Sequence, residues 1–106
     1  MTKDSVKTEY ADRILTLTVH GDIDHHSAKE LRETIDAALF YHRPQTLRLV
    51  LSEVSFMDSS GLGLILGRYT RMKELGGEMV LVTPTRQIMK ILTLAGIEKT
   101  LTVEKN

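Results

Sequence analysis

The stretch LRLVLSEVSFMDSSGLGLILG, residues 47–67, determines the architecture because it joins a strand pattern to a helix pattern through a polar corner. Leu47 to Leu51 is nearly continuous aliphatic, which is typical of a strand covered on both faces. The corner ends at Asp58-Ser59-Ser60, and a helix is predicted to begin there and to end at Gly76-Gly77. The residues expected on its buried face are Leu62, Ile65, Leu66, Tyr69, Met72 and Leu75.

The same strand-then-helix unit recurs downstream. Met79 to Val82 indicates a second buried strand, and Thr83-Pro84 is predicted to supply the N-cap and first-turn proline of a helix that Gly96 stops. A short edge strand is expected near Thr100 to Val103. The inward residues of this last helix are expected to be Ile88, Ile91, Leu92 and Ala95.

Upstream of residue 47, the pattern predicts a hairpin followed by a helix. Apolar residues alternate with polar ones over 6–10 and 15–20, across a short Ala11-Asp12 turn. After Gly21 the apolar spacing becomes helical, and this helix is opened either by Asp24 or by a Ser27/Glu30 capping box. It stops before Pro44, and its stripe is Ala28, Leu31, Ile35, Ala38 and Leu39.

The predicted order β-β-α-β-α-β-α-β belongs to the α/β class, with a small mixed β-sheet, parallel in the middle, and helices packed on it. In such units the carboxyl end of a strand and the amino end of the next helix share one edge of the sheet. Three segments should therefore meet at that edge. They are the aspartate corner (Asp22-Ile23-Asp24), the serine corner (Met57-Asp58-Ser59-Ser60) and the threonine corner (Thr83-Pro84-Thr85).

Composition excludes several classes of function. The 106 residues carry 14 basic and 14 acidic side chains and no cysteine, so neither disulfides nor thiolate metal sites are expected. Even charge and five aromatic residues argue against nucleic-acid binding. The apolar runs are too short for a membrane span, and residues 1–13 lack a signal-peptide pattern. We expect one domain over residues 1–106, in the cytoplasm.

The serines at the start of the central helix have two interpretations. Ser59 and Ser60 either cap free backbone N–H groups or offer a hydroxyl whose phosphate would meet those groups. Three glycines in the same helix each lower its propensity by about 0.8–1.0 kcal/mol relative to alanine. Gly63 and Gly67 either allow a close approach of another element, or Gly61 leaves the serine corner open to a protein.

Two kinds of chemistry are possible at this edge but poorly supported. A serine hydrolase would need Ser59, His25 and Asp24 to gather, yet the G-x-S-x-G elbow is absent. A metal site would need ligands from Asp22, Asp24, His25 and His26, whose side chains diverge at a helix start. Solvated polar residues are the simpler interpretation, so no metal and no catalytic residue is expected.

Three stretches carry a family resemblance: GDIDHH at 21–26, SFMDSSGLGLILGRY at 55–69 and GGEM at 76–79. Together they resemble the STAS-domain anti-anti-sigma factors, most of all the sporulation antagonists of the anti-sigma factor that holds sigma-F. The likeness covers nearly the whole chain, and it implies the STAS fold and a regulatory protein rather than an enzyme.

The resemblance also implies a mechanism. The phosphorylated serine of the family falls on Ser59, and Asp58 and Asp24 correspond to acidic positions near it. The unmodified form is expected to bind a serine kinase, in its ADP-bound or ATP-bound state, that doubles as the anti-sigma factor; a phosphatase resets the modified form. No cofactor is required, because ATP belongs to the partner. Ser60, Gly61 and Thr85 are expected to support partner binding. A STAS antagonist from another stress-response pathway remains the alternative.

Overall fold

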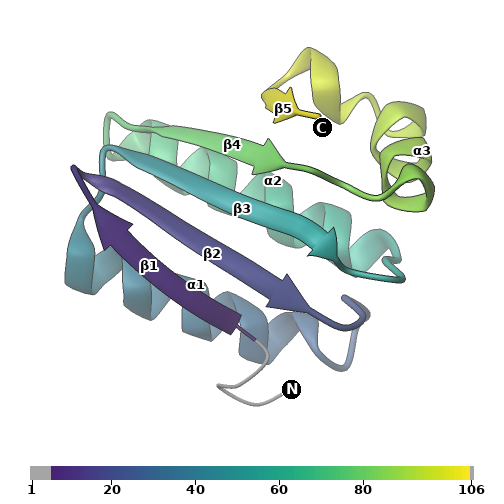
Figure 1. The fold of residues 1–106 in the computed structure, drawn as a ribbon, viewed down its shortest axis with the longest axis horizontal. Coiled ribbons are helices and arrows are strands. Elements are labelled where there is room, and N and C mark those ends of the chain that lie inside the picture. Colours follow the sequence, from purple (N-terminus) through teal and green to yellow (C-terminus); the bar gives the residue numbers. More distant parts are fainter. Residues whose placement is uncertain (1–5, 106) are drawn as a thin grey trace.

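Five strands form one mixed sheet in the computed structural model of the protein, which describes residues 6–105 (Figure 1). The sheet order is β1-β2-β3-β4-β5, with β1 antiparallel to β2 and all other neighbours parallel. The strands are β1 (Val6–Ala11), β2 (Ile14–His20), β3 (Thr46–Glu53), β4 (Glu78–Val82) and β5 (Thr102–Glu104). The helices are α1 (Ala28–His42), α2 (Ser59–Glu74), α3 (Arg86–Leu94) and the short 3-10 helix η2 (Ile97–Lys99).

The predicted order of strands and helices is confirmed, with η2 as an addition before the last strand. The hairpin turn lies one residue later than expected, because Asp12 and Arg13 both have positive φ angles, 53° and 66°. Residues 1–5 of the N-terminal stretch considered for a signal peptide, and Asn106 of the expected domain, lie outside the described residues. Within residues 6–105, no helix is long and apolar enough to cross a membrane.

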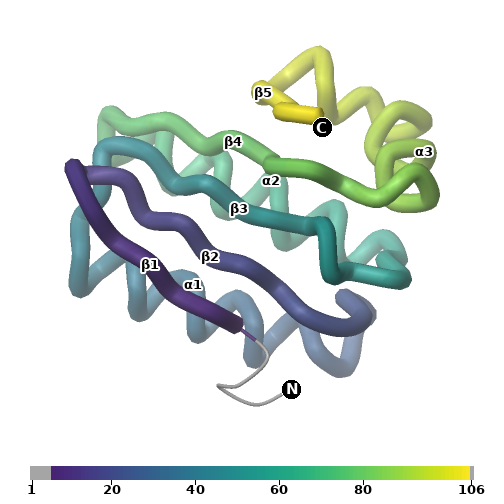
Figure 2. Tube along the Cα trace, viewed as in Figure 1, coloured from purple at the N-terminus to yellow at the C-terminus, as the bar shows by residue number. Residues whose placement is uncertain are grey.

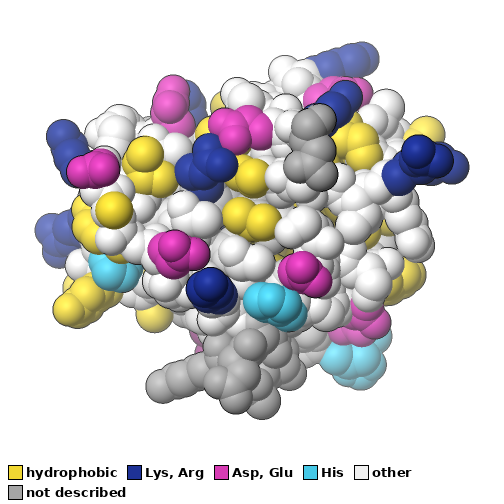
Figure 3. Space-filling model, in the orientation of Figure 1, with side chains coloured by type: hydrophobic (Ala, Val, Ile, Leu, Met, Phe, Trp, Pro, Cys, Tyr) yellow, Lys and Arg dark blue, Asp and Glu magenta, His cyan; other side chains and the backbone are white. Residues whose placement is uncertain are grey.

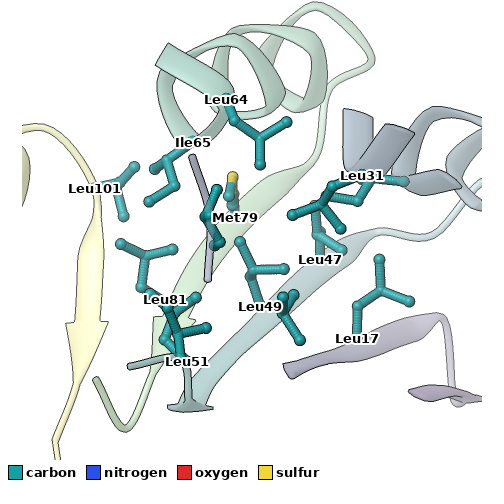
Figure 4. Packing of buried hydrophobic residues seen from close by; sticks show 14 of the residues in the cluster. Leu17, Leu31, Leu47, Leu49, Leu51, Leu64, Ile65, Met79, Leu81 and Leu101 are labelled. Carbon is teal, nitrogen blue, oxygen red and sulfur yellow. The ribbon is translucent and has the colours of Figure 1, made fainter. Parts of the chain in front are cut away.

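Helices α1 and α2 pack side by side on one face of the sheet, while α3 lies beyond β4 near β5 (Figures 1 and 2). The side chains between these layers form the core. Leucines of β2, β3 and β4 point toward apolar residues of α1 and α2 (Figure 4). The completely buried ones include Leu15, Leu17, Leu31, Ile35, Leu47, Leu49, Ile65 and Leu81. Burying each such side chain contributes about 1.5–3 kcal/mol, so this layer holds the helices in place.

The prediction that Leu47 to Leu51 is covered on both faces is wrong. Burial alternates along β3, with Leu47, Leu49 and Leu51 inside and Arg48 and Val50 partly exposed. No helix lies over this second face among the described residues, and Figure 3 shows charges of both signs scattered across it. Arg48 there donates to the Glu104 carboxylate at 2.9 Å and 3.1 Å. A nearly continuous aliphatic run therefore does not show that helices cover both faces of a strand, because half-buried positions on the uncovered face can be aliphatic too.

The buried face of α2 also differs from the predicted stripe. Leu64 is buried at 5% exposure, whereas Leu66 and Leu75 are 39% and 57% exposed. The helix turns Gly61 toward the sheet, and at about 100° per residue this places residues 64, 65, 68 and 72 on the same face. The rotation of the helix is thus set by the close approach at Gly61, which the spacing of leucines did not reveal.

The start of α3 lies two residues later than predicted. Thr83 directly follows β4 with a φ of 51°, and its N–H donates to Glu104 O at 2.7 Å. Thr85 is the N-cap instead, and its Oγ1 accepts from Ile88 N at 3.2 Å. Ile88 and Leu92 are buried as expected, but Ala95 is exposed because it is the C-cap. Gly96 ends the segment with a φ of 73°.

Candidate functional site

The aspartate and serine corners are joined by backbone hydrogen bonds beyond the ends of β2 and β3. Ile23 pairs with Met57 in an isolated parallel bridge. Ile23 N donates to Phe56 O at 2.9 Å, and Asp58 N donates to Ile23 O at 3.2 Å. Figure 2 shows these two loops at one end of the sheet. The expectation that both corners share an edge is confirmed.

Side-chain hydrogen bonds hold the aspartate corner in shape. The Ser55 hydroxyl donates to Asp22 Oδ1 at 2.7 Å, which ties this corner to the segment before Met57. Asp24 Oδ1 accepts from His26 N at 2.9 Å and from Ser27 N at 3.0 Å. Asp24 therefore opens the turn into α1, and Ser27 makes no side-chain cap bond to the helix. Neither predicted helix start is met in full: α1 begins at Ala28 with Ser27 in the N-cap position, Ser27 forms no side-chain cap bond, and Asp24 caps the turn that precedes the helix.

The charge on Asp24 is favoured by these same bonds. The hydrogen bond from Ser27 N lowers the pKa of the Asp24 carboxyl below its usual value, with smaller contributions from the His26 N–H and the His26 charge. Desolvation of the carboxyl, the second-largest contribution, raises the pKa but does not reverse the shift. Asp24 thus stays ionised beside the serine corner at any physiological pH.

Asp58 is the N-cap of α2, and this leaves the hydroxyl of Ser59 free. Asp58 Oδ1 accepts from Ser60 N at 2.8 Å. Ser59 is the first residue of the helix, its side chain is exposed, and its hydroxyl makes no hydrogen bond within residues 6–105. The capping interpretation of Ser59 is therefore wrong: the carboxylate one residue earlier takes that role. Ser60 is half-buried and turned away from full solvent contact.

The glycines of α2 have roles opposite to those weighed from the sequence. A Cβ on Gly61 would overlap Met57 Cγ and lie 3.2 Å from Ile23 Cγ2, so Gly61 permits the close approach of the helix to both corners. A Cβ on Gly63 or Gly67 would meet nothing within 4 Å. Gly63 is exposed and lies four residues after Ser59, on the same side of the helix.

The threonine corner lies at the carboxyl end of β4, but it is not hydrogen-bonded to the serine corner within the described residues. Thr85 is engaged in capping α3, and Thr83 is bonded to β5. Of the three predicted corners, two are therefore linked directly and the third only shares the sheet edge. Within residues 6–105, Thr85 makes no hydrogen bond to the serine corner, so its predicted support of that corner is not observed as a direct bond.

The residues weighed for a hydrolytic relay, Ser59, His25 and Asp24, are not hydrogen-bonded to one another in that arrangement within residues 6–105. Asp22 Oδ1 and Asp24 Oδ1 both accept local hydrogen bonds. The rings of His25 and His26 lie against each other at a tilt of 39°, with centroids 3.9 Å apart. Neither histidine is hydrogen-bonded to Ser59 in the described part of the chain. Among residues 6–105, no group of three or more His, Cys, Asp or Glu side chains is arranged to hold a metal ion.

Two features of the structure were missed at the sequence level. The Ser55–Asp22 hydrogen bond spans 33 positions, and only the strand pairing brings its partners together. Arg68 lies on the inner side of α2, with 12% of its side chain exposed, and its Nε approaches Asp36 Oδ1 of α1 at 3.1 Å. A cation on a helix face surrounded by buried positions 64, 65 and 72 was the available signal.

Comparison with known proteins gives a consistent result. The family model described as STAS domain matches residues 5–106. The chain is 32% identical over 101 residues to the anti-sigma F factor antagonist of Paenibacillus polymyxa, covering 95% of this chain and 86% of that protein. It is 34% identical over 83 residues to the anti-sigma F factor antagonist of Lysinibacillus sphaericus, covering 78% and 71%. It is 28% identical to the anti-sigma-B factor antagonist of Bacillus subtilis, covering 89% and 84%.

Solved structures agree with these relatives. The anti-sigma factor antagonist SpoIIAA in its unphosphorylated form superposes with a TM-score of 0.73 at 26% identity, covering 95% of this chain and 88% of that one. The phosphorylated form of SpoIIAA, a Bacillus cell fate determinant, superposes with a TM-score of 0.72 at 27% identity, covering 95% and 92%. The two forms match this fold equally well.

Proposed function

This chain belongs to the STAS domain family, and we propose that it acts there as an anti-sigma factor antagonist switched by phosphorylation of Ser59. One observation carries the proposal: an exposed hydroxyl, free of hydrogen bonds among the described residues, stands at the first position of a helix whose cap is supplied by Asp58. The helix does not need this hydroxyl for its own stability. It is therefore available for modification.

The partner we propose is an anti-sigma factor that is also a serine kinase, bound in its ATP-loaded or ADP-loaded state. Asp24 and Asp58 are its proposed contacts, since both lie on the joined corners beside Ser59. Ser60 borders the same surface. Gly61 is buried, so we propose that it acts by positioning the helix rather than by touching the partner. Thr85 is kept as a more distant contact on the same sheet edge.

The switch needs no refolding. A phosphate adds about −1.5 to −2 charges at Ser59, next to the carboxylate of Asp58. The positive end of the α2 dipole tolerates this charge, but an interface that must be desolvated against it does not. A loss of about 4 kcal/mol turns nanomolar into micromolar binding, which is enough to separate the complex. A phosphatase acting on phospho-Ser59 would restore binding.

We propose that the protein acts in the sigma-F pathway of sporulation, and the two anti-sigma F factor antagonists at 32% and 34% identity support this assignment. The sigma-B type, represented at 28% identity, is the second candidate. In either pathway, we propose that this protein is a cytoplasmic regulator and not an enzyme, and that residues 1–106 form one domain. Direct binding measurements against the anti-sigma factor of each pathway distinguish them.

The first experiment tests the acceptor. The chain is incubated with the cognate kinase and ATP, and intact-mass spectrometry counts the phosphates added. We expect one phosphate on the native chain and on Ser60→Ala, and none on Ser59→Ala. A phosphate that persists on Ser59→Ala contradicts the assignment.

The second experiment tests the role of charge. Ser59→Asp should bind the kinase at least about tenfold more weakly while keeping a near-native melting temperature. Thr70→Asp is the matched control, because it adds the same charge to an exposed position of α2 distant from the serine corner. If the two variants weaken kinase binding equally, or if neither weakens it, then charge at the serine corner is not the signal.

A further inference from the structure

A cavity of about 630 Å³ lies between the second halves of α1 and α2. Arg68 and Arg71 line it, and they stand nine and twelve residues beyond Ser59 on α2. At 1.5 Å per residue, Arg71 is about 18 Å from the serine corner along the helix. The cavity is therefore distinct from the proposed phosphorylation site, and a ligand bound there would leave the serine corner uncovered.

Arg68 forms the inner wall of this cavity with incomplete partners. Its Nε approaches Asp36 Oδ1 at 3.1 Å, but the pair lacks the alignment of a hydrogen bond. Nε and Nη1 are both buried, and neither has a hydrogen-bond acceptor in the part of the chain that the structure describes. Buried polar groups are nearly always hydrogen-bonded, and a buried donor without an acceptor costs about 1–3 kcal/mol. These two donors are enclosed by protein and lack an acceptor within residues 6–105, while the rest of the Arg68 side chain lines the cavity.

Positive side chains outnumber negative ones among the residues that line the cavity. Arg43 and Arg71 also line the cavity, against the one carboxylate of Asp36. Burial lowers the pKa of Arg68, Asp36 raises it, and the like charges of Arg32 and Arg71 lower it. The last carbonyls of the two helices are partly satisfied by backbone N–H groups of Arg43 and Leu75, which limits their opposition to an anion. An added anion would relieve this repulsion.

The outer part of the cavity is apolar. Phe40 and Leu75 line it and are 74% and 57% exposed, although both are large hydrophobic residues. The Arg43 guanidinium carbon lies 5.5 Å from the centre of the Phe40 ring. Small-molecule sites commonly enclose about 300–1,000 Å³ and combine apolar walls with a few polar groups. The cavity has this size and this division of surfaces.

We propose that the cavity between α1 and α2 binds a small organic anion, whose carboxylate or phosphate pairs with Arg68 and Arg71 and whose apolar chain or ring lies against Phe40 and Leu75. Arginine suits both headgroups because its planar fork meets two oxygens at once. Occupancy stabilises the packing of α1 on α2, because the anion offsets the excess positive charge of the arginines that line the cavity.

The test uses the full chain and two probes, decanoate and phenyl phosphate, followed by ¹H–¹⁵N NMR titration. We expect saturable shifts confined to residues 36–44 and 68–75, from at least one probe, at concentrations up to about 1 mM. Decyltrimethylammonium, with the same chain and the opposite charge, should cause none. Shifts centred on the serine corner, shifts from the cation, or no saturable shift from either probe would overturn the proposal.

Variants identify the residues that hold the anion. Arg68→Gln should weaken binding about tenfold or more, since a charge-assisted hydrogen bond is lost. Arg48→Gln is the matched control, because Arg48 is also ion-paired but lies on the opposite face of the sheet. If Arg68→Gln perturbs folding, the exposed Arg71→Gln provides the same test with an expected weakening of about threefold or more. Binding unchanged in either cavity variant contradicts the proposal.

Discussion

Ile23 forms a parallel backbone bridge with Met57 after β2 and β3 have ended. The two residues are also buried together under Gly61, at 0% and 2% exposure. This contact aligns Asp24 and Asp58, each one position further along the chain, on the same edge of the sheet. The acidic surface around Ser59 therefore depends on a contact between two apolar residues that take no part in its chemistry.

The cap at Asp58 can be separated from its charge. Asp58→Ala removes the acceptor for Ser60 N and should lower the free energy of unfolding by about 1 kcal/mol. Asp58→Asn retains a cap oxygen without the charge and should stay near native stability. Urea denaturation measures both, and kinase binding of the Asn variant then reports the charge alone. Equal destabilisation by the two variants would mean that charge, not the hydrogen bond, supports the helix.

Gly61 and Gly63 should respond oppositely to the same substitution. Gly61→Ala forces a Cβ into Met57 and should destabilise the protein by about 1–3 kcal/mol. Gly63→Ala meets open space and should stabilise it by about 0.5–1 kcal/mol through helix propensity. Chemical denaturation of the two variants against the native chain gives the comparison. A stabilising Gly61→Ala would show that α2 does not approach the corners this closely.

Leu64 and Leu66 test the rotation of α2. Leu64→Ala empties a buried position and should cost about 2–5 kcal/mol of stability. Leu66→Ala, at 39% exposure, should cost well under half of that. Thermal unfolding of the pair decides between this rotation and the face predicted from leucine spacing. A larger loss for Leu66→Ala would restore the predicted face.

The Asp24 carboxyl should titrate below the usual aspartate value of 3.8. Because the folded pKa is the lower one, the charged form stabilises the fold above 3.8, and this contribution is lost as the pH falls through the lowered pKa. Carboxyl-carbon NMR measures the titration directly. The free energy of unfolding of Asp24→Asn should lack the loss on acidification that the Asp24 carboxyl contributes in the native chain. A titration at or above 3.8 would mean that the Ser27 and His26 N–H groups do not hold the carboxylate in solution.

How far the sequence predicts this protein depends on the range of each interaction. The order of strands and helices along the chain, and the helix ends near Pro44, Gly76 and Gly96, follow from local backbone preferences, and the structure agrees with them. The start of α3 moved from Thr83 to Thr85 because Thr83 is drawn into pairing with β5. That pairing partner is 21 residues away, so no local pattern could indicate it.

The candidate site divides in the same way. Asp58, Ser59 and Asp24 could be selected from their place at strand ends and helix starts, because parallel strand–helix units always bring such positions to one edge. Which of them caps the helix, and which keeps a free hydroxyl, required the actual geometry. Ser59 is a cap if the helix begins one residue later, and it has a free hydroxyl if the helix begins at Ser59 itself. Only packing decides between these two starting points.

The amino-acid sequence by itself determined the alternation of strands and helices, the shared sheet edge and the residues that could be modified, because these depend on periodicity and turn chemistry within a few residues. Tertiary structure decided the rotation of α2, the close packing at Gly61, the uncovered face of the sheet and the partly unpaired Arg68. Each of these depends on packing between segments that are far apart in the chain, and a local sequence pattern contains no information about such packing.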